Sequence, residues 1–391
     1  MTTIGTVLVV LGFGLGIYAY FLYPALLRII AMARPRPIRA GEPEQWPMVS
    51  ITVPAYNEER SIAGTLEALL DIDYPADRRQ ILVVSDASSD RTDEIVRGFA
   101  DRGVELLRQP ARAGKTAAEN AARALLRGDI IVNTDASVRI AKDALKPLIR
   151  CFGDPEVGVA SGRDVSVANM EHDLNLGESQ YVGYEMWLRD LETSVGSIVG
   201  ASGCFYAVRR NLHMTIVPEA LSRDFAAALI AREHDYRAVS VHDAVCYVPR
   251  IASLRHEFRR KVRTMTRGLE TLYFKRHLLN PFRYGLFAWM LGSHKLIRWL
   301  VPWGIIAIAV GSLLLAVSVS STWGWITLGV FAGFAALASL GWWWPESRKA
   351  PSFISIPTFL ASAVIAAINS WVGALRGDLN PIWEPTRRKP L

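Results

Sequence analysis

Three long stretches of the chain contain no charged side chain, and no other feature restricts its fold as strongly. They cover residues 4–27, 299–345 and 351–375. A helix needs about 20 mainly apolar residues to cross a bilayer. The first and last stretches therefore predict one crossing each. The middle stretch is long enough for two, with a break at residues 318–325, where small polar residues and tryptophans concentrate. We expect a membrane protein.

The first apolar stretch is predicted to form a retained N-terminal anchor, residues 1–33. It lacks the basic start and the small-residue cleavage site of a signal peptide. Glycines within it would let another helix approach closely, namely Gly12, Gly14 and Gly16. Arginines follow it directly, so the positive-inside rule places the next segment in the cytoplasm, at the inner membrane of the cell: Arg28, Arg34, Arg36 and Arg39.

The same rule creates a conflict at the other end of the chain. One span before the polar segment and three after it would send the basic tail, residues 377–391, to the outside. Either the last apolar stretch is interfacial or re-entrant, or the tail is an exception to the rule. The sequence leaves both interpretations open.

The formal net charge of +7 does not indicate a nucleic-acid partner. The basic residues cluster beside the apolar stretches, where anionic membrane lipids attract Lys and Arg, and no nucleic-acid-binding motif is present. The three cysteines lie in the predicted cytoplasmic segment, and their odd number predicts free thiols: Cys151, Cys204 and Cys246.

Between the apolar stretches, residues 44–258 alternate between strands and helices, as is typical of a doubly wound α/β domain. Its first part predicts strands at residues 49–53, 80–84, 104–107 and 130–132, and helices beginning near Ser61, Thr92 and Ala117. Its second part predicts a strand at residues 157–161, an amphipathic helix at 174–191 and a strand pair or hairpin at 199–208. A basic segment, residues 259–298, leads to membrane helices within residues 299–376.

Acidic side chains follow three of the predicted strands, at Glu58, Asp86 and Asp135. The carboxyl ends of parallel strands meet at one edge of a sheet, where ligands collect. Packing does not explain three acids at one edge, because like charges repel. A bound ligand does, since a ribose, a base edge and a metal ion would each interact with one carboxylate. Asp135 is the candidate ligand for Mg²⁺ or Mn²⁺, which bind through one or two carboxylates and substrate phosphates. Alternatively, Asp135 caps the helix expected near Ala141.

The segment Gly114–Lys115–Thr116 is similar to the end of a phosphate-binding P-loop. That motif also needs a glycine five positions before the Gly-Lys pair, and position 109 is Gln. An ATPase is therefore excluded. Lys115 is still a candidate contact for a nucleotide, and a solvated lysine at a helix start is the alternative.

Two further segments contain candidate site residues. Small residues permit a substrate to approach the backbone closely, and a plain hairpin explains them equally well: Gly200, Ala201, Ser202 and Gly203. Asp224 opens a predicted helix, where the helix dipole alone favours an acid. Beside a nucleotide crevice it becomes the candidate catalytic base, which would take the proton of an acceptor hydroxyl.

The basic segment before the membrane helices is predicted to be helical, with Arg260, Arg263 and Arg267 on one face. Guanidinium groups donate in planar pairs and suit a diphosphate. Lipid head groups explain the same charges, and we expect the segment to serve both. Residues 281–298 mix aromatic and basic side chains, as an interfacial helix does.

These motifs, in this order, resemble glycosyltransferase family 2, specifically its membrane-integrated members that make exopolysaccharides or glycolipids. The matching segments lie between about residues 48 and 270 and include residues 53–59, 86–90, 114–115, 134–137, 200–210, 222–224 and 260–264. The resemblance implies a Rossmann-like α/β GT-A fold and a nucleoside-diphosphate sugar donor, with a UDP-sugar expected.

The resemblance also implies roles for individual residues. Glu58 and Asp86 would lie near the nucleoside, and Asp135 would hold the metal ion on the diphosphate. Asp224 would act as base, and Arg260 with Arg263 would cover the diphosphate. A base opposite the leaving group implies inversion, so that an α-linked donor yields a β-linked product.

The sequence departs from the family pattern in three places. Ser137 replaces the second acid of the metal motif, Arg223 replaces the Glu of the Glu-Asp pair at the base, and Thr264 replaces the tryptophan of processive synthases. We therefore expect transfer of one sugar to a lipid-linked or membrane lipid acceptor. A processive polysaccharide synthase and a non-catalytic nucleotide-sugar-binding scaffold or sensor are the alternatives, and the oligomeric state stays open.

Overall fold

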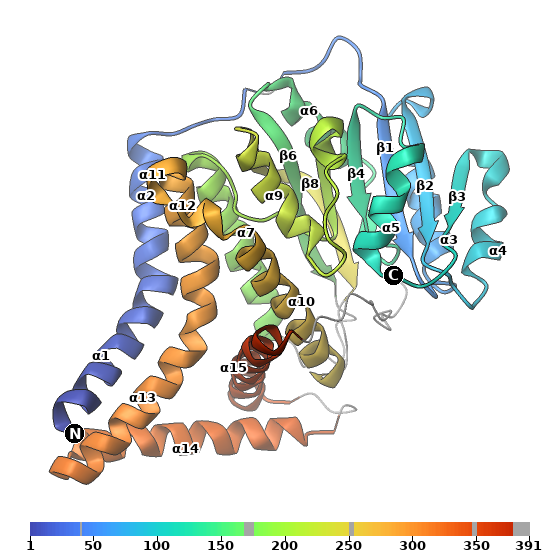
Figure 1. Ribbon diagram of the computed structural model, residues 1–391. Coiled ribbons are helices and arrows are strands. Elements are labelled where there is room, and N and C mark those ends of the chain that lie inside the picture. The colour runs from blue at the N-terminus through green and yellow to red at the C-terminus, as the bar shows by residue number, and fades with distance from the viewer. Residues whose placement is uncertain (40, 168–175, 250–253, 346–349, 378–391) are drawn as a thin grey trace.

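The computed structural model describes residues 1–39, 41–167, 176–249, 254–345 and 350–377. Figure 1 shows an α/β domain with long helices from both ends of the chain gathered on one side of it. The strands are β1 (Val49–Ala55), β2 (Arg79–Ser85), β3 (Val104–Arg108), β4 (Ile130–Thr134), β5 (Arg139–Ile140), β6 (Val157–Val167), β7 (Phe205–Arg209) and β8 (Arg237–Pro249). The domain helices are α3 (Ile62–Leu70), α4 (Thr92–Arg97), α5 (Lys115–Ala122), α6 (Leu145–Arg150), α7 (Leu176–Val195), α8 (Arg210–His213) and α9 (Arg223–Glu233).

The eight described strands form one mixed sheet in the order β3-β2-β1-β4-β7-β6-β8-β5. The first four strands pair in parallel, as predicted, whereas β7 runs antiparallel to both β4 and β6. Side chains alternate across β7: Phe205 and Ala207 join the core on one face, and Tyr206 and Val208 join the core on the other. Helices therefore cover both faces, and the acids that follow the parallel strands share one edge.

In the second half of the domain one prediction was wrong and one strand was missed. Residues 199–204 form a loop and only β7 is a strand, because side chains hold this loop and no second strand pairs with it. The long strand β8 was not predicted. Its pairing with β6 shifts register between Ser240 and Val245, and His242 and Asp243 fall in that irregularity, so that they interrupt the apolar pattern.

Four described helical stretches are long and apolar enough to cross a membrane, in agreement with the predicted number. They are Thr2–Ala33, Leu286–Val319, Thr322–Trp342 and Ser352–Arg376. The predicted break in the middle apolar stretch is confirmed, since α13 (Arg298–Val319) ends just before α14 (Thr322–Trp342). Residues from Leu286 onward continue into α13 as one helical stretch, and an interfacial position of residues 281–298 stays a prediction.

The N-terminal anchor consists of α1 (Thr2–Ile17), a short π-helical turn and α2 (Tyr23–Ala33), and α1 packs along α13. A Cβ atom built on Gly12 would lie 2.4 Å from the carbonyl oxygen of Gly304, so Gly12 permits this contact. The same expectation for Gly14 and Gly16 was wrong, since nothing lies within 4 Å of a Cβ at either position.

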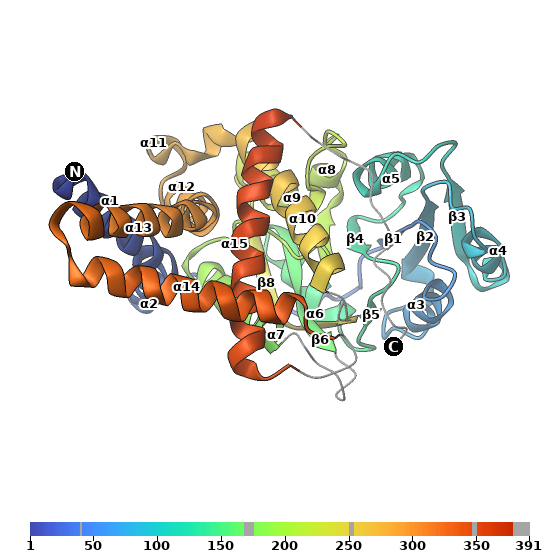
Figure 2. The same cartoon turned by 90° about the horizontal axis from the view of Figure 1, so that it is seen from below.

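The remaining helices fix the domain to the membrane helices. An apolar cluster that includes Tyr23, Leu188, Leu229 and Leu291 joins α2, α7, α9 and α12 (Leu286–Leu291). Helix α10 (Leu254–Phe274) contacts both α9 and α15 (Ser352–Arg376). Figures 1 and 2 show that α14 crosses the direction of α1 and α13 and that α15 lies across α14. All three cysteines are free thiols, as predicted.

Candidate active site

Asp135 follows β4 at the carboxyl end of the parallel strands and forms an ion pair with Lys115 at the start of α5. The Lys115 Nζ donates to Asp135 Oδ1 at 2.6 Å and to the carbonyl oxygen of Gly203 at 2.9 Å. Asp135 does not cap the next helix, because the N-cap of α6 is Ala144. Burial alone would lower the pKa of Lys115, but the carboxylates of Asp135, Glu119 and Asp224 outweigh it and raise this pKa. The ammonium group therefore stays charged.

Asp224 lies in the first turn of α9, next to the same loop. The Ser222 hydroxyl donates to Asp224 Oδ1. A Cβ atom built on Gly203 would lie 2.6 Å from Asp224 Oδ2, so only glycine leaves room for the carboxylate there. Gly203 thus contacts Lys115 through its carbonyl group and Asp224 through its bare Cα. The structure brings Lys115, Asp135, Gly203 and Asp224 together.

Asp86 and Glu58 lie at the same edge, after β2 and β1, and both have local partners. The two carboxylate oxygens of Asp86 accept the backbone N–H groups of Ala113 and Gly114, each at 2.8 Å. This anchors the loop before Lys115, and Gly114 adopts a φ of +96° there. Glu58 accepts a hydrogen bond from the Ser61 hydroxyl at 2.5 Å. Contact of Asp86 and Glu58 with a nucleoside stays a prediction.

The arginines of α10 have different partners. Both the Nε and Nη2 atoms of Arg260 donate to Glu257, at 2.9 and 2.8 Å. Arg263 is half-buried on the same helix. Arg267 donates through Nη2 to the Thr116 hydroxyl at 2.7 Å and to the carbonyl oxygen of Leu221. Arg267 therefore connects α10 with α5 and with the segment before Asp224.

Arg267 was not among the predicted site residues, although its spacing from Arg260 and Arg263 placed it on their face. Burial lowers its pKa, against the raising effect of Asp224 and Glu119. The guanidinium group thus stands beside the same carboxylates that surround Lys115. Of these three arginines, Arg267 has the contacts that reach the convergent residues.

Hydrogen bonds between Ser202 and β6 hold the loop of Gly200–Gly203 in place. The Ser202 amide donates to Ser161 Oγ at 2.8 Å, and its hydroxyl donates to Asp164 at 2.6 and 2.7 Å. Burial raises the pKa of Asp164. Ala201 and Ser202 are buried, so the backbone of the loop lines the site. No sequence signal singled out Asp164, because it lies within the long strand β6.

Glu119, one helical turn after Lys115, is fully buried. Neither carboxylate oxygen has a hydrogen-bond partner among the described residues, and the nearest cation is the Nε of Arg223 at 3.9 Å. Burial raises the pKa of Glu119, although Lys115 and Arg223 oppose it. Arg223 donates to Asn120 Oδ1 at 2.5 Å and to the carbonyl oxygen of His213 at 2.6 Å. The acid that faces Arg223, the residue before Asp224, is therefore Glu119 of α5.

A metal ion would find limited protein ligands here. Within the described ranges no group of three or more His, Cys, Asp or Glu side chains is placed to hold one. Asp135 offers one carboxylate, whose side chain is 23% exposed, and Ser137 stands where a second acid would be. This set fits an ion such as Mg²⁺ or Mn²⁺ that takes most of its ligands from a diphosphate.

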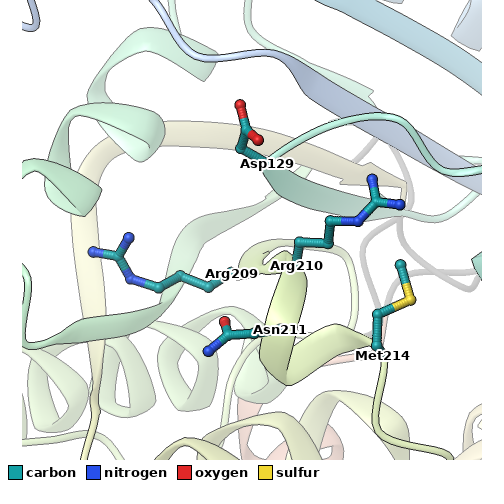
Figure 3. Close-up of a pocket in the computed structure, with 5 residues that line it drawn as sticks. All are labelled: Asp129, Arg209, Arg210, Asn211 and Met214. Carbon is teal, nitrogen blue, oxygen red and sulfur yellow. The ribbon is translucent and has the colours of Figure 1, made fainter.

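A hollow of about 410 Å³ lies at the opposite end of β4 from Asp135 (Figure 3). Its two arginines donate hydrogen bonds to backbone carbonyl groups: Arg209 Nε to that of Val157 and Arg210 Nη1 to that of Gly128. The remaining lining residues are Asp129, Asn211 and Met214. The hollow therefore contributes nothing to the convergent site.

The mixed sheet with its acids at one edge, together with the long apolar helices at both ends of the chain, defines a GT-A fold attached to candidate membrane helices. Residues 50–216 match the sequence model of glycosyl transferase family 2. This match agrees with the family that the resemblance implied.

Similar proteins include a beta-monoglucosyldiacylglycerol synthase of Trichormus variabilis, 30% identical over 46% of this chain and 40% of that protein. An N-acetylglucosaminyltransferase of Rhizobium meliloti is 32% identical over 49% of this chain and 46% of that protein. The matches thus span less than half the length of these relatives. A solved mannosyltransferase of Pyrobaculum calidifontis, in complex with GDP-Man and Mn²⁺, has a TM-score of 0.73 at 22% identity, over 96% of this chain and 98% of that one. This likeness establishes the fold.

Proposed function

We propose that this protein is a membrane-bound inverting glycosyltransferase that moves a sugar from a nucleoside-diphosphate sugar to a lipid-linked or membrane lipid acceptor. The observation that supports the proposal is the convergence of Asp135, Lys115, Gly203 and Asp224 at the carboxyl ends of the parallel strands. We place the α/β domain in the cytoplasm, at the inner membrane, because arginines follow the first apolar stretch.

The donor diphosphate would lie at the edge that holds Asp135. Asp135 would carry a Mg²⁺ or Mn²⁺ ion, which when bound neutralises the charge that develops on the leaving diphosphate. Lys115 adds a fixed positive charge beside it, and Arg267 contributes a guanidinium group that contacts Thr116 of α5. A UDP-sugar is our first choice of donor, and a GDP-sugar is the second.

Asp224 would act on the acceptor. Its carboxylate takes the proton from the acceptor hydroxyl as the oxygen attacks the anomeric carbon, and the bond to the diphosphate breaks on the opposite side. The configuration inverts, so an α-linked donor gives a β-linked product. Gly203 leaves the carboxylate unobstructed, and the loop of Gly200–Gly203 offers backbone to the acceptor.

The test is the substitution Asp224→Asn in the full-length protein with Mn²⁺ or Mg²⁺ present. We expect the rate of donor hydrolysis and sugar transfer to fall by about 10²- to 10⁴-fold, because the proton acceptor is lost. The donor Kd should stay within about twofold, since the substitution leaves the diphosphate contacts unchanged.

The control is Asp143→Asn, which removes an exposed carboxylate from the same domain and should change neither quantity. Equal turnover by Asp224→Asn and the parent protein would remove Asp224 from the mechanism. Donor binding without any turnover in the parent protein would instead support the scaffold or sensor alternative.

A further inference from the structure

Arg189, on α7, is a buried cation with unsatisfied hydrogen-bond donors in the part of the chain that the structure describes. Its side chain belongs to a residue that is only 9% exposed, and its Nε and Nη1 atoms have no hydrogen-bond partner among the described residues. A buried guanidinium group is strongly unfavourable unless an anion accepts its hydrogen bonds. The proposed chemistry at Asp224 gives Arg189 no role.

Lys295 is a second cation, half-buried, and it lies at the loop that lines the acceptor side. Its Cε and Nζ atoms are 3.5 and 3.7 Å from the position of a Cβ on Gly200. Its nearest carboxylate is Glu185, at 3.8 Å, which already accepts hydrogen bonds from His294 at 2.8 Å and Arg298 at 2.9 Å. Glu185 therefore leaves Lys295 incompletely neutralised.

The acids around these two cations already serve other groups. His294 lies 2.6 Å from Glu192 through Nδ1 and 2.8 Å from Glu185 through Nε2. Asp164 lies within electrostatic range of Arg189, but its two oxygens accept the Ser202 hydroxyl at 2.6 and 2.7 Å. These acids therefore leave the Nε and Nη1 atoms of Arg189 without an acceptor among the described residues.

The location separates this cluster from the donor side. Lys115 meets the loop at Gly203, whereas Lys295 meets it at Gly200. Helix α7 contacts α2 and α15 as well as β6 and β8, and Figure 1 shows it between the sheet and the long apolar helices. The Tyr23 hydroxyl of α2 donates to Glu192 at 2.7 Å. The two cations therefore lie where a lipid head group would enter from the membrane.

We propose that Arg189 and Lys295 bind a phosphate group in the head group of the acceptor lipid, so that the acceptor is a phosphate-bearing lipid and not an uncharged one. This rests on the proposed function, which it makes more specific. A guanidinium group donates to two phosphate oxygens at once, and the neighbouring ammonium adds a point charge. The phosphate oxygens would then accept the hydrogen bonds that Arg189 Nε and Nη1 do not make to the described residues.

The experiment compares two short-chain lipids that differ only in the phosphate, dihexanoyl phosphatidic acid and dihexanoylglycerol, added to the detergent-solubilised full-length protein. We expect the phosphate-bearing lipid to raise the Tm with increasing concentration and the uncharged lipid to leave it unchanged. Inorganic phosphate at the same concentration should have a much smaller effect. Equal stabilisation by both lipids, or by inorganic phosphate alone, contradicts the proposal.

The variants Arg189→Gln and Lys295→Gln should each weaken this lipid binding at least tenfold, whereas Arg276→Gln, an exposed arginine after α10, should not. A structural role alone would lower the Tm without lipid but leave the lipid-induced shift intact. If Arg189→Gln does not fold, Lys295→Gln and the lipid comparison in the parent protein still decide.

Donor hydrolysis without added lipid separates this proposal from the proposed function. We expect Arg189→Gln to keep the donor Kd and hydrolysis rate of the parent protein. A loss of donor affinity equal to the loss of lipid affinity would assign the two cations to the donor and refute the acceptor site, while the glycosyltransferase proposal would stand. Absent hydrolysis in the parent protein would refute the function and leave lipid binding to be judged by the Tm shifts.

Discussion

Lys115 is the residue that connects the parts of the candidate site. Its ammonium group holds the end of β4 through Asp135 and the Gly200–Gly203 loop through the carbonyl group of Gly203. These contacts join segments that are 20 and 88 positions away in the chain. The lysine thus sets the distance between the donor edge and the loop beside Asp224.

Gly203 should be sensitive to the addition of a single methyl group. In Gly203→Ala the new Cβ would meet Asp224 Oδ2 at 2.6 Å, so the carboxylate has to rotate away. We expect kcat to fall about 10- to 100-fold, as for a misplaced catalytic group. The Tm should change little, because the clash is with the end of a flexible side chain. Steady-state kinetics and thermal unfolding measure both.

The matched control is Gly196→Ala in the same connection before β7. A Cβ at this position has no heavy atom within 4 Å, so both kcat and Tm should stay near the parent values. An unchanged kcat in Gly203→Ala would show that Asp224 tolerates the shift.

Glu119 should make stability depend on pH. Burial raises its pKa in the folded protein, so folding takes up a proton between the unfolded value, about 4.3, and the folded one. This stabilisation is fully present below the unfolded pKa and is lost as the pH rises through the folded pKa. In Glu119→Gln the Tm difference between pH 5 and pH 8 should therefore be smaller than in the parent protein.

The control variant should remove a carboxylate that stays exposed in the folded protein. Glu44→Gln removes an exposed one and should leave the pH dependence of the Tm unchanged. An identical pH dependence in Glu119→Gln and the parent protein would contradict the raised pKa of Glu119.

At the scale of elements, three helices from different parts of the chain meet at the site. Helix α5 begins at Lys115, α9 begins beside Asp224, and α10 reaches both through Arg267. Helix α10 also packs on α15, where Ser370 donates to the carbonyl oxygen of Val262 at 3.1 Å. A displacement of α15 would therefore be transmitted to the segment before Asp224.

The contact between α1 and α13 gives a prediction for the anchor. A Cβ on Gly12 would lie 2.4 Å from Gly304 O, so Gly12→Ala forces the backbones apart. We expect a loss of about 1–3 kcal/mol, as for overpacking in other close contacts. Gly14→Ala, in the same helix with nothing within 4 Å, should stay within about 0.5 kcal/mol. Thermal unfolding in detergent measures both, and equal effects would refute the contact.

At the scale of the whole molecule, the four apolar helices do not run side by side. Helices α1 and α13 are neighbours along their length, whereas α14 and α15 cross them (Figures 1 and 2). The last turns of α15 contact α10 and α13, since Ser370 donates to the carbonyl oxygen of Val262 and Trp371 to that of Trp299. Helix α15 also contacts α7 of the α/β domain, which favours the interfacial or re-entrant interpretation of the last apolar stretch.

We therefore predict that the basic tail lies on the same side of the membrane as the α/β domain. Its cations, Arg387, Arg388 and Lys389, fall outside the described residues but would then obey the positive-inside rule. Pro390→Cys, in a protein whose three native cysteines are replaced by serine, should react with an impermeant thiol reagent only after the cells are opened. Labelling of intact cells would place the tail outside and support four complete crossings.

The sequence by itself determined where the parallel strands lie along the chain, which acids follow them and which stretches are apolar. These depend on local periodicity and on the rule that parallel strands share a carboxyl edge. Only the tertiary structure decided that Lys115 joins Asp135 to Gly203, that Glu119 faces Arg223, and that Gly12 but not Gly14 meets another helix. Those contacts join residues far apart in the chain, and their geometry depends on how loops and helices pack in three dimensions.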